Sequence, residues 1–182
     1  YKLVKTMRAG VLVLGSLLTK YGKAKVSLPG GCAIGTRPVD LHLFALKKLG
    51  AKIKIKDGYI LAEAKKGLKG AKIRFPSVSV GATENALLAA YGAEGKTILM
   101  NCAIEPEIMD LISFLRKLGC KIKTSGRKIT FISKLLTKNK ISHQIIFDRI
   151  EAGTYLVAGA LIGKKIKINK IKPKILKCEI DI

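Results

Sequence analysis

The sequence predicts an α/β fold in which apolar helices form the centre and sheets surround them, the reverse of a barrel with its helices outside. The first observation is a repeat: Leu115–Lys123 matches Leu46–Lys54, so that Gly119 corresponds to Gly50, roughly 69 residues earlier. The second is that each copy contains a helix without a polar stripe, and such a helix is normally buried. The third is the alternation of Lys and Ile in the strands, which predicts sheets with one solvated face. Central helices with sheets around them satisfy both requirements.

The first copy is predicted to contain an apolar helix, a strand, a second helix, a hairpin and a further strand. Gly50 closes the second helix, and the Asp57-Gly58 pair is a strong hairpin signal between its two strands. These elements are predicted over Lys5–Tyr21, Ala24–Leu28, Val39–Leu49, Lys52–Lys56, Tyr59–Glu63 and Lys72–Ser79.

The second copy repeats this order, and a third copy begins after it. Glu105-Pro106 opens the second helix of the second copy, and a Ser125-Gly126 turn joins the strands of its hairpin. The second copy is predicted over Ala86–Ala90, Thr97–Met100, Glu105–Gly119, Lys121–Lys123 and Lys128–Ile132, and the third begins with a helix over Ile150–Gly163 and a strand over Lys165–Asn169.

The net charge of +23, from 35 basic and 12 acidic residues, is compatible with nucleic-acid binding. However, many lysines alternate with isoleucines in predicted strands, and only six of the basic residues are arginines, the side chain favoured for phosphate and base recognition. The absence of Trp, with five Tyr and five Phe, leaves few aromatic rings for base stacking. The pattern favours a solvated, lysine-rich surface.

The four cysteines are far apart and form no CxxC pair, which excludes the usual zinc and small disulfide scaffolds and favours reduced thiols in the cytoplasm. No signal peptide and no apolar run long enough for a bilayer is recognisable. Because the sequence begins with Tyr1 and stops inside a Lys/Ile-rich stretch, we expect it to be a piece of a longer chain.

The most informative stretch is Gly30–Asp40, a glycine-rich loop between a predicted strand and a predicted helix. Pro38 suits the first helical turn, and a helix N-terminus favours an anion. Cys32 and Arg37 lie together in this loop, where positive surroundings would lower the pKa of the thiol and make it reactive. The alternative is a small buried cysteine beside a structural arginine.

Several segments together resemble the bacterial UDP-N-acetylglucosamine 1-carboxyvinyltransferases, a family of enolpyruvyl transferases. The likeness runs through essentially the whole sequence, which would cover less than half of a complete family chain. It is carried by Lys5–Ala9, Ser27–His42, Val78–Asn85, Glu105–Ile108 and Asp148–Thr154.

The resemblance implies an inside-out α/β barrel of repeated βαβαββ units, here incomplete. Residues 1–147 would form most of one enolpyruvyl transferase domain, and residues 148–182 would cross into the second. The implied reaction transfers enolpyruvyl from phosphoenolpyruvate to the 3-hydroxyl of UDP-N-acetylglucosamine and releases phosphate, without a metal or organic cofactor. This is the first committed step of peptidoglycan synthesis, and it implies a cytoplasmic enzyme that serves cell-wall biogenesis, cell shape and cell division.

The resemblance also assigns roles to individual residues. Cys32 resembles the loop cysteine that acts as general acid towards the methylene carbon of phosphoenolpyruvate and can form an adduct there. Arg37 resembles an arginine at the phosphate and carboxylate groups, and Arg8 one that lines the same cleft. The remaining substrate-binding positions fall in two groups, with Pro38, Val39, Asp40 and Leu41 at uracil and ribose, and Ser77, Ser79, Val80 and Gly81 at the diphosphate.

Two positions depart from the family pattern. Ser77 stands where many relatives have a lysine, so one diphosphate contact is in question. Ile104 stands where relatives commonly have an arginine. Taken without the resemblance, Asp40 is an ordinary first-turn acid, Gly81 a turn glycine, and Arg8 and Arg149 are members of structural ion pairs.

Other family site residues lie outside this sequence, so we expect the 182 residues alone to be catalytically inert. A shikimate-pathway-type enolpyruvyl transferase and a non-enzymatic basic RNA-binding domain are the alternatives. The Cys32 loop argues against the first, and the second predicts RNA binding that weakens steeply with salt.

Overall fold

The computed structural model describes residues 8–28, 39–133, 140–163 and 165–176, with the side chain of Arg8 left out. The chain divides into two compact units, residues 1–141 and residues 142–182. The domain boundary predicted at residues 147 and 148 stays a prediction.

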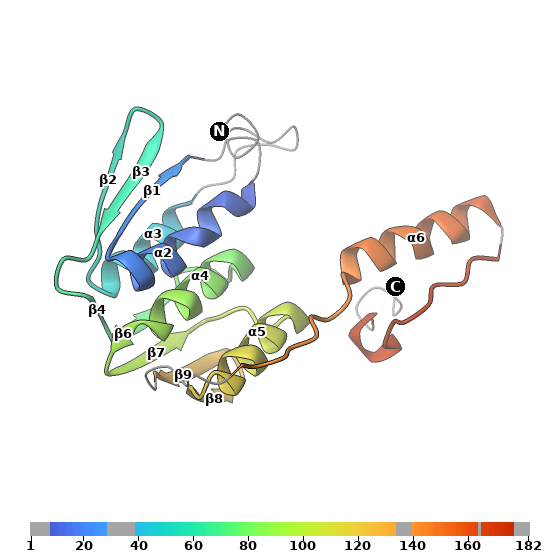
Figure 1. Ribbon diagram of the computed structural model, residues 1–182. Helices are drawn as coiled ribbons and strands as arrows, with labels where there is room; N and C mark the ends of the chain where they lie inside the picture. Colours follow the sequence, from blue (N-terminus) through green and yellow to red (C-terminus); the bar gives the residue numbers. More distant parts are fainter. Residues whose placement is uncertain (1–7, 29–38, 134–139, 164, 177–182) are drawn as a thin grey trace. The chain divides into compact units, whose positions relative to one another are not determined.

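The first unit places helices between two sheets (Figure 1). Helix α2 (Val13–Tyr21), preceded by the 3-10 turn η1 (Arg8–Leu12), packs on strand β1 and on helix α4 (Val80–Tyr91). Helices α3 (Asp40–Lys48) and α5 (Pro106–Lys117) both contact α4. The mixed helix and sheet content confirms the predicted α/β class.

The two sheets show the repeat directly. The first sheet has the order β1-β3-β2 and is antiparallel throughout. The second sheet repeats this arrangement with the order β7-β9-β8, and β5 pairs in parallel with β7 at its edge. A third, two-stranded sheet pairs β4 with β6 in parallel. The strands are β1 (Lys23–Ser27), β2 (Lys52–Lys56), β3 (Tyr59–Glu63), β4 (Leu68–Lys69), β5 (Lys72–Arg74), β6 (Ala93–Glu94), β7 (Lys96–Met100), β8 (Lys121–Ser125) and β9 (Lys128–Ile132).

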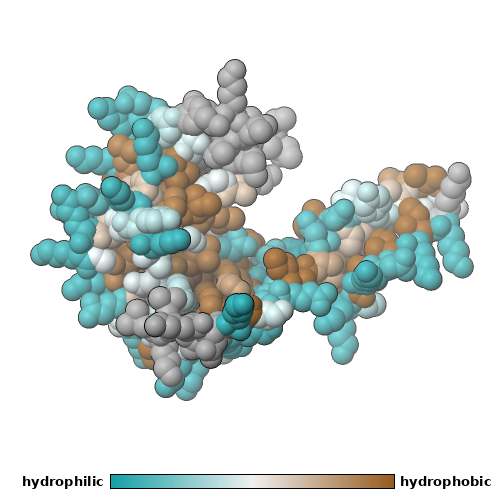
Figure 2. Space-filling view, viewed as in Figure 1, coloured by the Kyte–Doolittle hydropathy of each residue, from teal (hydrophilic) through white to brown (hydrophobic). Residues whose placement is uncertain are grey.

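Both hairpins close with two residues, as predicted. In the first, Asp57 and Gly58 both have positive φ, which suits the primed turns that match strand twist. In the second, the turn residues are Gly126 and Arg127, one position later than predicted, and Gly126 takes the positive φ. Lys52, Lys54 and Lys56 of β2 are exposed, and hydrophilic residues cover this side of the unit in Figure 2.

Helix α4 is buried on nearly all sides, which confirms the predicted central helix. Helix α2 is buried on one side only, so the prediction that this apolar helix is buried all round is wrong: Leu14 and Leu18 enter the core, whereas Val13 and Tyr21 remain exposed. In the described part of the unit, α2 packs mainly on α4, β1 and η1.

Three predictions about strands need correction. The strand predicted over residues 72–79 ends at Arg74, because Phe75 makes the last hydrogen bond to Met100, Pro76 has no N–H to donate, and Ser79 caps α4. The short strands β4 and β6 were not predicted, because a strand of two residues is too short to show an alternation of apolar and polar side chains. No strand forms over residues 165–169, since alternation alone supplies no hydrogen-bonding partner.

The second unit contains helix α6 (Arg149–Ile162) and the 3-10 turn η2 (Pro173–Leu176), which contact each other. Asp148 caps α6, accepting hydrogen bonds from the N–H groups of Ile150 and Glu151 at 2.8 and 3.1 Å. The predicted helix is confirmed, but its apolar side chains are largely exposed, and among its residues only Ala152 is buried. No helix in the described ranges has the length and apolar character that a membrane crossing requires.

Candidate functional site

Two helix N-termini meet in the first unit, and the sequence-predicted binding residues that the structure describes lie on or just before them. Helix α3 begins after Val39, with the exposed Asp40 and the half-buried Leu41 in its first turn. Helix α4 begins after Ser79, with Val80 and Gly81 in its first turn. The structure therefore brings these two predicted groups together, through the contact of α3 with α4.

Ser79 begins α4 as an N-cap. Its Oγ accepts a hydrogen bond of 3.3 Å from the N–H of Ala82, and its carbonyl accepts one of 2.8 Å from the hydroxyl of Thr83. This cap accounts for the presence of a serine here without any ligand. The Ser79 hydroxyl can still donate its hydrogen outward, because capping uses only a lone pair of the oxygen.

The two helix starts differ in charge. The first turn of α3 contains Asp40, whose carboxylate offsets the positive end of the helix dipole, whereas the first turn of α4 contains no acid. The N–H groups of an initial turn are not used inside the helix, so the start of α4 suits an anion. Asp40 beside it is a hydrogen-bond acceptor suited to hydroxyl and N–H groups.

His42 joins the two helix starts. It is only 6% exposed, and a Cβ atom added to Gly81 would lie 3.0 Å from its Cε1 atom and 3.3 Å from Nε2. A Cβ at this distance would require the imidazole to move by a few tenths of an ångström. Gly81 thus has a packing reason to be glycine, in addition to its predicted contact with a diphosphate.

Asn85, one turn further along α4, binds the other side of the imidazole. Its Nδ2 atom lies 3.2 Å from Nδ1 of His42 and donates to the carbonyl of Val11 at 3.0 Å, while its Oδ1 accepts from the N–H of Gly15 at 2.7 Å. His42 and Asn85 were both missed as site residues. The signal that could have found this pair is the helical spacing of Asn85, which falls three residues after Ala82 and four before Ala89, on the same apolar face.

The other predicted residues are placed less fully. Cys32, Arg37 and Pro38 lie outside the described residues, and of Arg8 only the backbone, in η1, is described. Ser77 is exposed in the irregular segment before α4.

The described cysteines are unsuited to nucleophilic chemistry. Cys102 and Cys120 are buried, and burial raises the pKa of the Cys102 thiol to about 12, against a smaller lowering effect of a hydrogen bond to the Ile129 backbone. A thiol of this kind stays protonated at neutral pH and is inert. Among the described residues, no three His, Cys, Asp or Glu side chains gather as a metal site.

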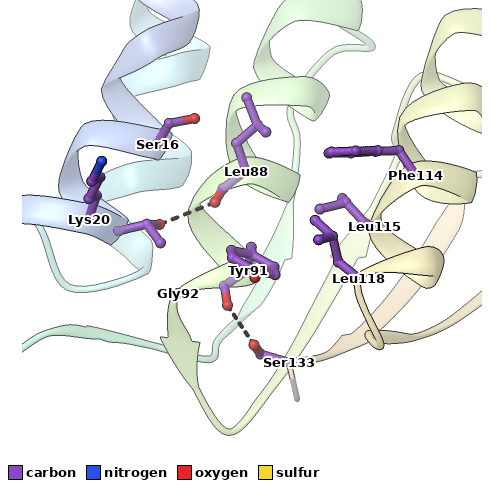
Figure 3. A pocket seen from close by; sticks show the side chains of 10 residues that line it. Ser16, Lys20, Leu88, Tyr91, Gly92, Phe114, Leu115, Leu118 and Ser133 are labelled. Atoms are coloured by element: carbon purple, nitrogen blue, oxygen red, sulfur yellow. Dashed lines mark hydrogen bonds between the residues drawn. The ribbon is translucent and has the colours of Figure 1, made fainter. Parts of the chain in front are cut away.

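A separate cavity of about 590 Å³ lies at the opposite end of α4 (Figure 3). Its walls are mostly apolar, and the hydroxyls of Thr19 and Ser133 are already hydrogen-bonded to the carbonyls of Leu88 and Tyr91. Of the described residues in this lining, only Lys20 is charged and none is a predicted binding residue, so the helix starts remain the candidate site. The lining residues are Ser16, Thr19, Lys20, Leu88, Tyr91, Gly92, Phe114, Leu115, Leu118 and Ser133.

Comparison with known families and proteins gives a consistent result. The family model described as EPSP synthase (3-phosphoshikimate 1-carboxyvinyltransferase) matches residues 1–182. A protein of Pelagibacter ubique named UDP-N-acetylglucosamine 1-carboxyvinyltransferase is 60% identical over 182 residues, which are 100% of this chain and 44% of that protein. Proteins of the same name from Rickettsia akari and Caulobacter vibrioides are 56% and 49% identical, covering 92% and 100% of this chain and 40% and 42% of theirs. The chain thus spans less than half the length of these relatives.

Solved structures agree on the fold. The enolpyruvyl transferase NikO of Streptomyces tendae superimposes with a TM-score of 0.71 at 21% identity, over 87% of this chain and 38% of NikO. An EPSP synthase of Acinetobacter baumannii gives a TM-score of 0.61 at 23% identity, over 84% of this chain and 35% of that one. At these identities the likeness establishes the fold alone, and it confirms the predicted enolpyruvyl transferase-like fold.

Proposed function

Since the chain belongs to the EPSP synthase family, we propose that it supplies the sugar-nucleotide side of a UDP-N-acetylglucosamine 1-carboxyvinyltransferase. The proposed reaction joins the 3-hydroxyl of UDP-N-acetylglucosamine to the enolpyruvyl group of phosphoenolpyruvate and releases phosphate. The observation that carries the proposal is the 60% identity, through all 182 residues, to a protein of that name. A role in peptidoglycan synthesis, and with it in cell shape and division, and a cytoplasmic location follow from the same proposal.

The geometry of the helix starts is compatible with this substrate. The start of α4, with Ser79, Val80 and Gly81 and without an acid in its first turn, would receive the diphosphate. Val39, Asp40 and Leu41 at the start of α3, together with Pro38, would hold the uracil and ribose, with Asp40 accepting hydrogen bonds.

The charged and reactive groups complete the proposed roles. Arg37 would bind phosphate and carboxylate oxygens in pairs, and Arg8 would line the same cleft. Ser77 would make a weaker diphosphate contact than a lysine, because a hydroxyl carries no charge. Cys32 would deliver a proton to the methylene carbon of phosphoenolpyruvate.

The experiment is calorimetric titration of UDP-N-acetylglucosamine into the natural full-length protein, the Arg37→Ala variant and the control Arg74→Ala, an exposed arginine on β5. Binding by the wild type and the control, with an affinity at least tenfold weaker in Arg37→Ala, supports the proposal. Parallel titrations test the alternatives. Binding of shikimate 3-phosphate instead of the sugar nucleotide, or RNA binding that falls steeply with salt, would overturn it.

A further inference from the structure

Asn85 connects three separate elements from within α4. Its side chain is fully buried, at 0% exposure, and its amide contacts Val11 in η1, Gly15 in α2 and His42 in α3. A buried amide with all these partners is satisfied and held in one orientation. Neither the predicted site nor the proposed function assigns it a role.

The partners fix which end of the amide faces which group. The backbone N–H of Gly15 can only donate, so the atom 2.7 Å from it must be the oxygen Oδ1. The carbonyl of Val11 can only accept, so the atom 3.0 Å from it must be the nitrogen Nδ2. This assignment follows from the backbone groups and is independent of the usual ambiguity between amide oxygen and nitrogen.

The orientation of Asn85 in turn determines the tautomer of His42. Because Nδ2 of Asn85 has only hydrogens to offer, Nδ1 of His42, 3.2 Å away, must accept and therefore carries no proton. The neutral ring then carries its proton on Nε2, the nitrogen that lies against Gly81 at the start of α4.

We infer that Asn85 is a positioning residue for the proposed sugar-nucleotide site. It keeps His42 in the tautomer with its proton on Nε2, beside Gly81, and through this ring it holds the start of α3 against that of α4. The inference rests on the proposed function, because the ligand received by these helix starts is UDP-N-acetylglucosamine.

A first test needs no variant. Long-range proton–nitrogen NMR of the full-length protein, with His42 assigned by comparison with a His42→Gln sample, distinguishes a protonated from an unprotonated ring nitrogen. The expected spectrum has an unprotonated Nδ1 and a protonated Nε2 in the absence of ligand. A proton on Nδ1 of the neutral ring would overturn the inference.

The second test uses Asn85→Asp. Its carboxylate can still accept from the N–H of Gly15, but while ionised it can no longer donate to the Val11 carbonyl or to His42, so it favours a proton on Nδ1 of His42. Ile112→Val is the matched control, because it loosens the packing of the buried core without touching the amide or the imidazole. The readouts are the ring spectrum, the Kd for UDP-N-acetylglucosamine and the separate KM values of the two substrates.

We expect Asn85→Asp to protonate Nδ1 and to raise the Kd and the KM for UDP-N-acetylglucosamine about tenfold, with the KM for phosphoenolpyruvate unchanged. Ile112→Val should change none of these. Equal sugar-nucleotide affinity in Asn85→Asp and wild type overturns the inference alone. A wild type that binds no UDP-N-acetylglucosamine overturns the proposed function as well, so the two failures are distinguishable.

Discussion

The backbone N–H of Gly15 in α2 donates a hydrogen bond of 2.7 Å to Oδ1 of Asn85 in α4, 70 residues along the chain. This separation is close to the length of the sequence repeat, so corresponding points of the two repeated helices face each other. The helices approach closely there because Gly15 has no side chain: an added Cβ would lie 2.5 Å from the Asn85 carbonyl oxygen. The contact between α2 and α4 at the centre of the unit is therefore a contact between corresponding helices of the two repeats.

Gly15→Ala should therefore destabilise the first unit severely. The new methyl group would meet backbone as well as the Asn85 amide, so α2 and α4 would have to separate, at a cost of about 3 kcal/mol or more. Urea unfolding measures the change. Ser16→Ala, on the exposed side of the same helix, is the control and should be neutral within about 0.5 kcal/mol. Equal stability of the two variants would contradict the close contact.

Glu84 should make stability depend on pH. Burial, and then the nearby Glu107 carboxylate, raise its pKa above the usual 4.5, so the folded state binds the proton more tightly than the unfolded state. The stability that the protonated Glu84 contributes to the fold is fully present below pH 4.5 and is lost as the pH rises through the raised pKa.

Glu84→Gln should consequently stabilise the protein at pH 7 and lose this advantage near pH 4. We expect a gain below about 0.5 kcal/mol, because solvent screens a carboxyl that is only half-buried. Thermal unfolding across this pH range measures it, with the exposed Glu94→Gln as the control. A Glu84→Gln advantage that grew towards low pH would have the wrong sign.

Cys32 should be the site of alkylation by the epoxide fosfomycin. The prediction depends on the resemblance of its loop to that of the enolpyruvyl transferases, in which this cysteine reacts at the phosphoenolpyruvate position. The full-length protein is treated with fosfomycin in the presence of UDP-N-acetylglucosamine and mapped by mass spectrometry of its peptides. We expect the adduct on Cys32, and we expect the Cys32→Ser variant to form none. An unmodified Cys32 under these conditions argues against the assignment.

Cys102 should resist general thiol reagents in the folded protein. With a pKa of about 12, its thiolate is scarce at pH 8, and we expect iodoacetamide to label it roughly a thousandfold more slowly than an ordinary cysteine. Labelling in urea gives the unfolded reference rate. Similar rates before and after unfolding would show that Cys102 is accessible and ionised in the native state.

Asp148→Ala should loosen the start of α6 in the second unit. The change removes the oxygen that accepts from the N–H groups of Ile150 and Glu151, a capping interaction worth about 1 kcal/mol. Amide hydrogen exchange in the first turn should accelerate about fivefold. Thr154→Ala, which removes a bond to the Ile150 carbonyl inside the helix, should leave protection unchanged or increase it, since alanine favours helix.

The sequence by itself determined the class of fold, the repeat and most elements. Hairpin turns at Asp57-Gly58 and near Gly126, a proline at the start of α5 and the apolar run of α4 are local signals, because each depends on the chemistry of neighbouring residues. The helix start at Val39, Asp40 and Leu41 was also visible in the sequence, whereas a strand was predicted through Ser79, and only the family resemblance placed Ser79, Val80 and Gly81 at a binding site.

Only the tertiary structure decided how these local pieces meet. The residue spacing did not reveal that the imidazole of His42 lies against Gly81, or that Asn85 binds it from the other side, because these residues come from different helices. The same reason accounts for the Lys/Ile alternation at residues 165–169, which predicted a strand that does not form. Alternation reports which side chains favour water, whereas a strand and a buried polar pair both require a partner from elsewhere in the chain, and only the folded structure supplies it.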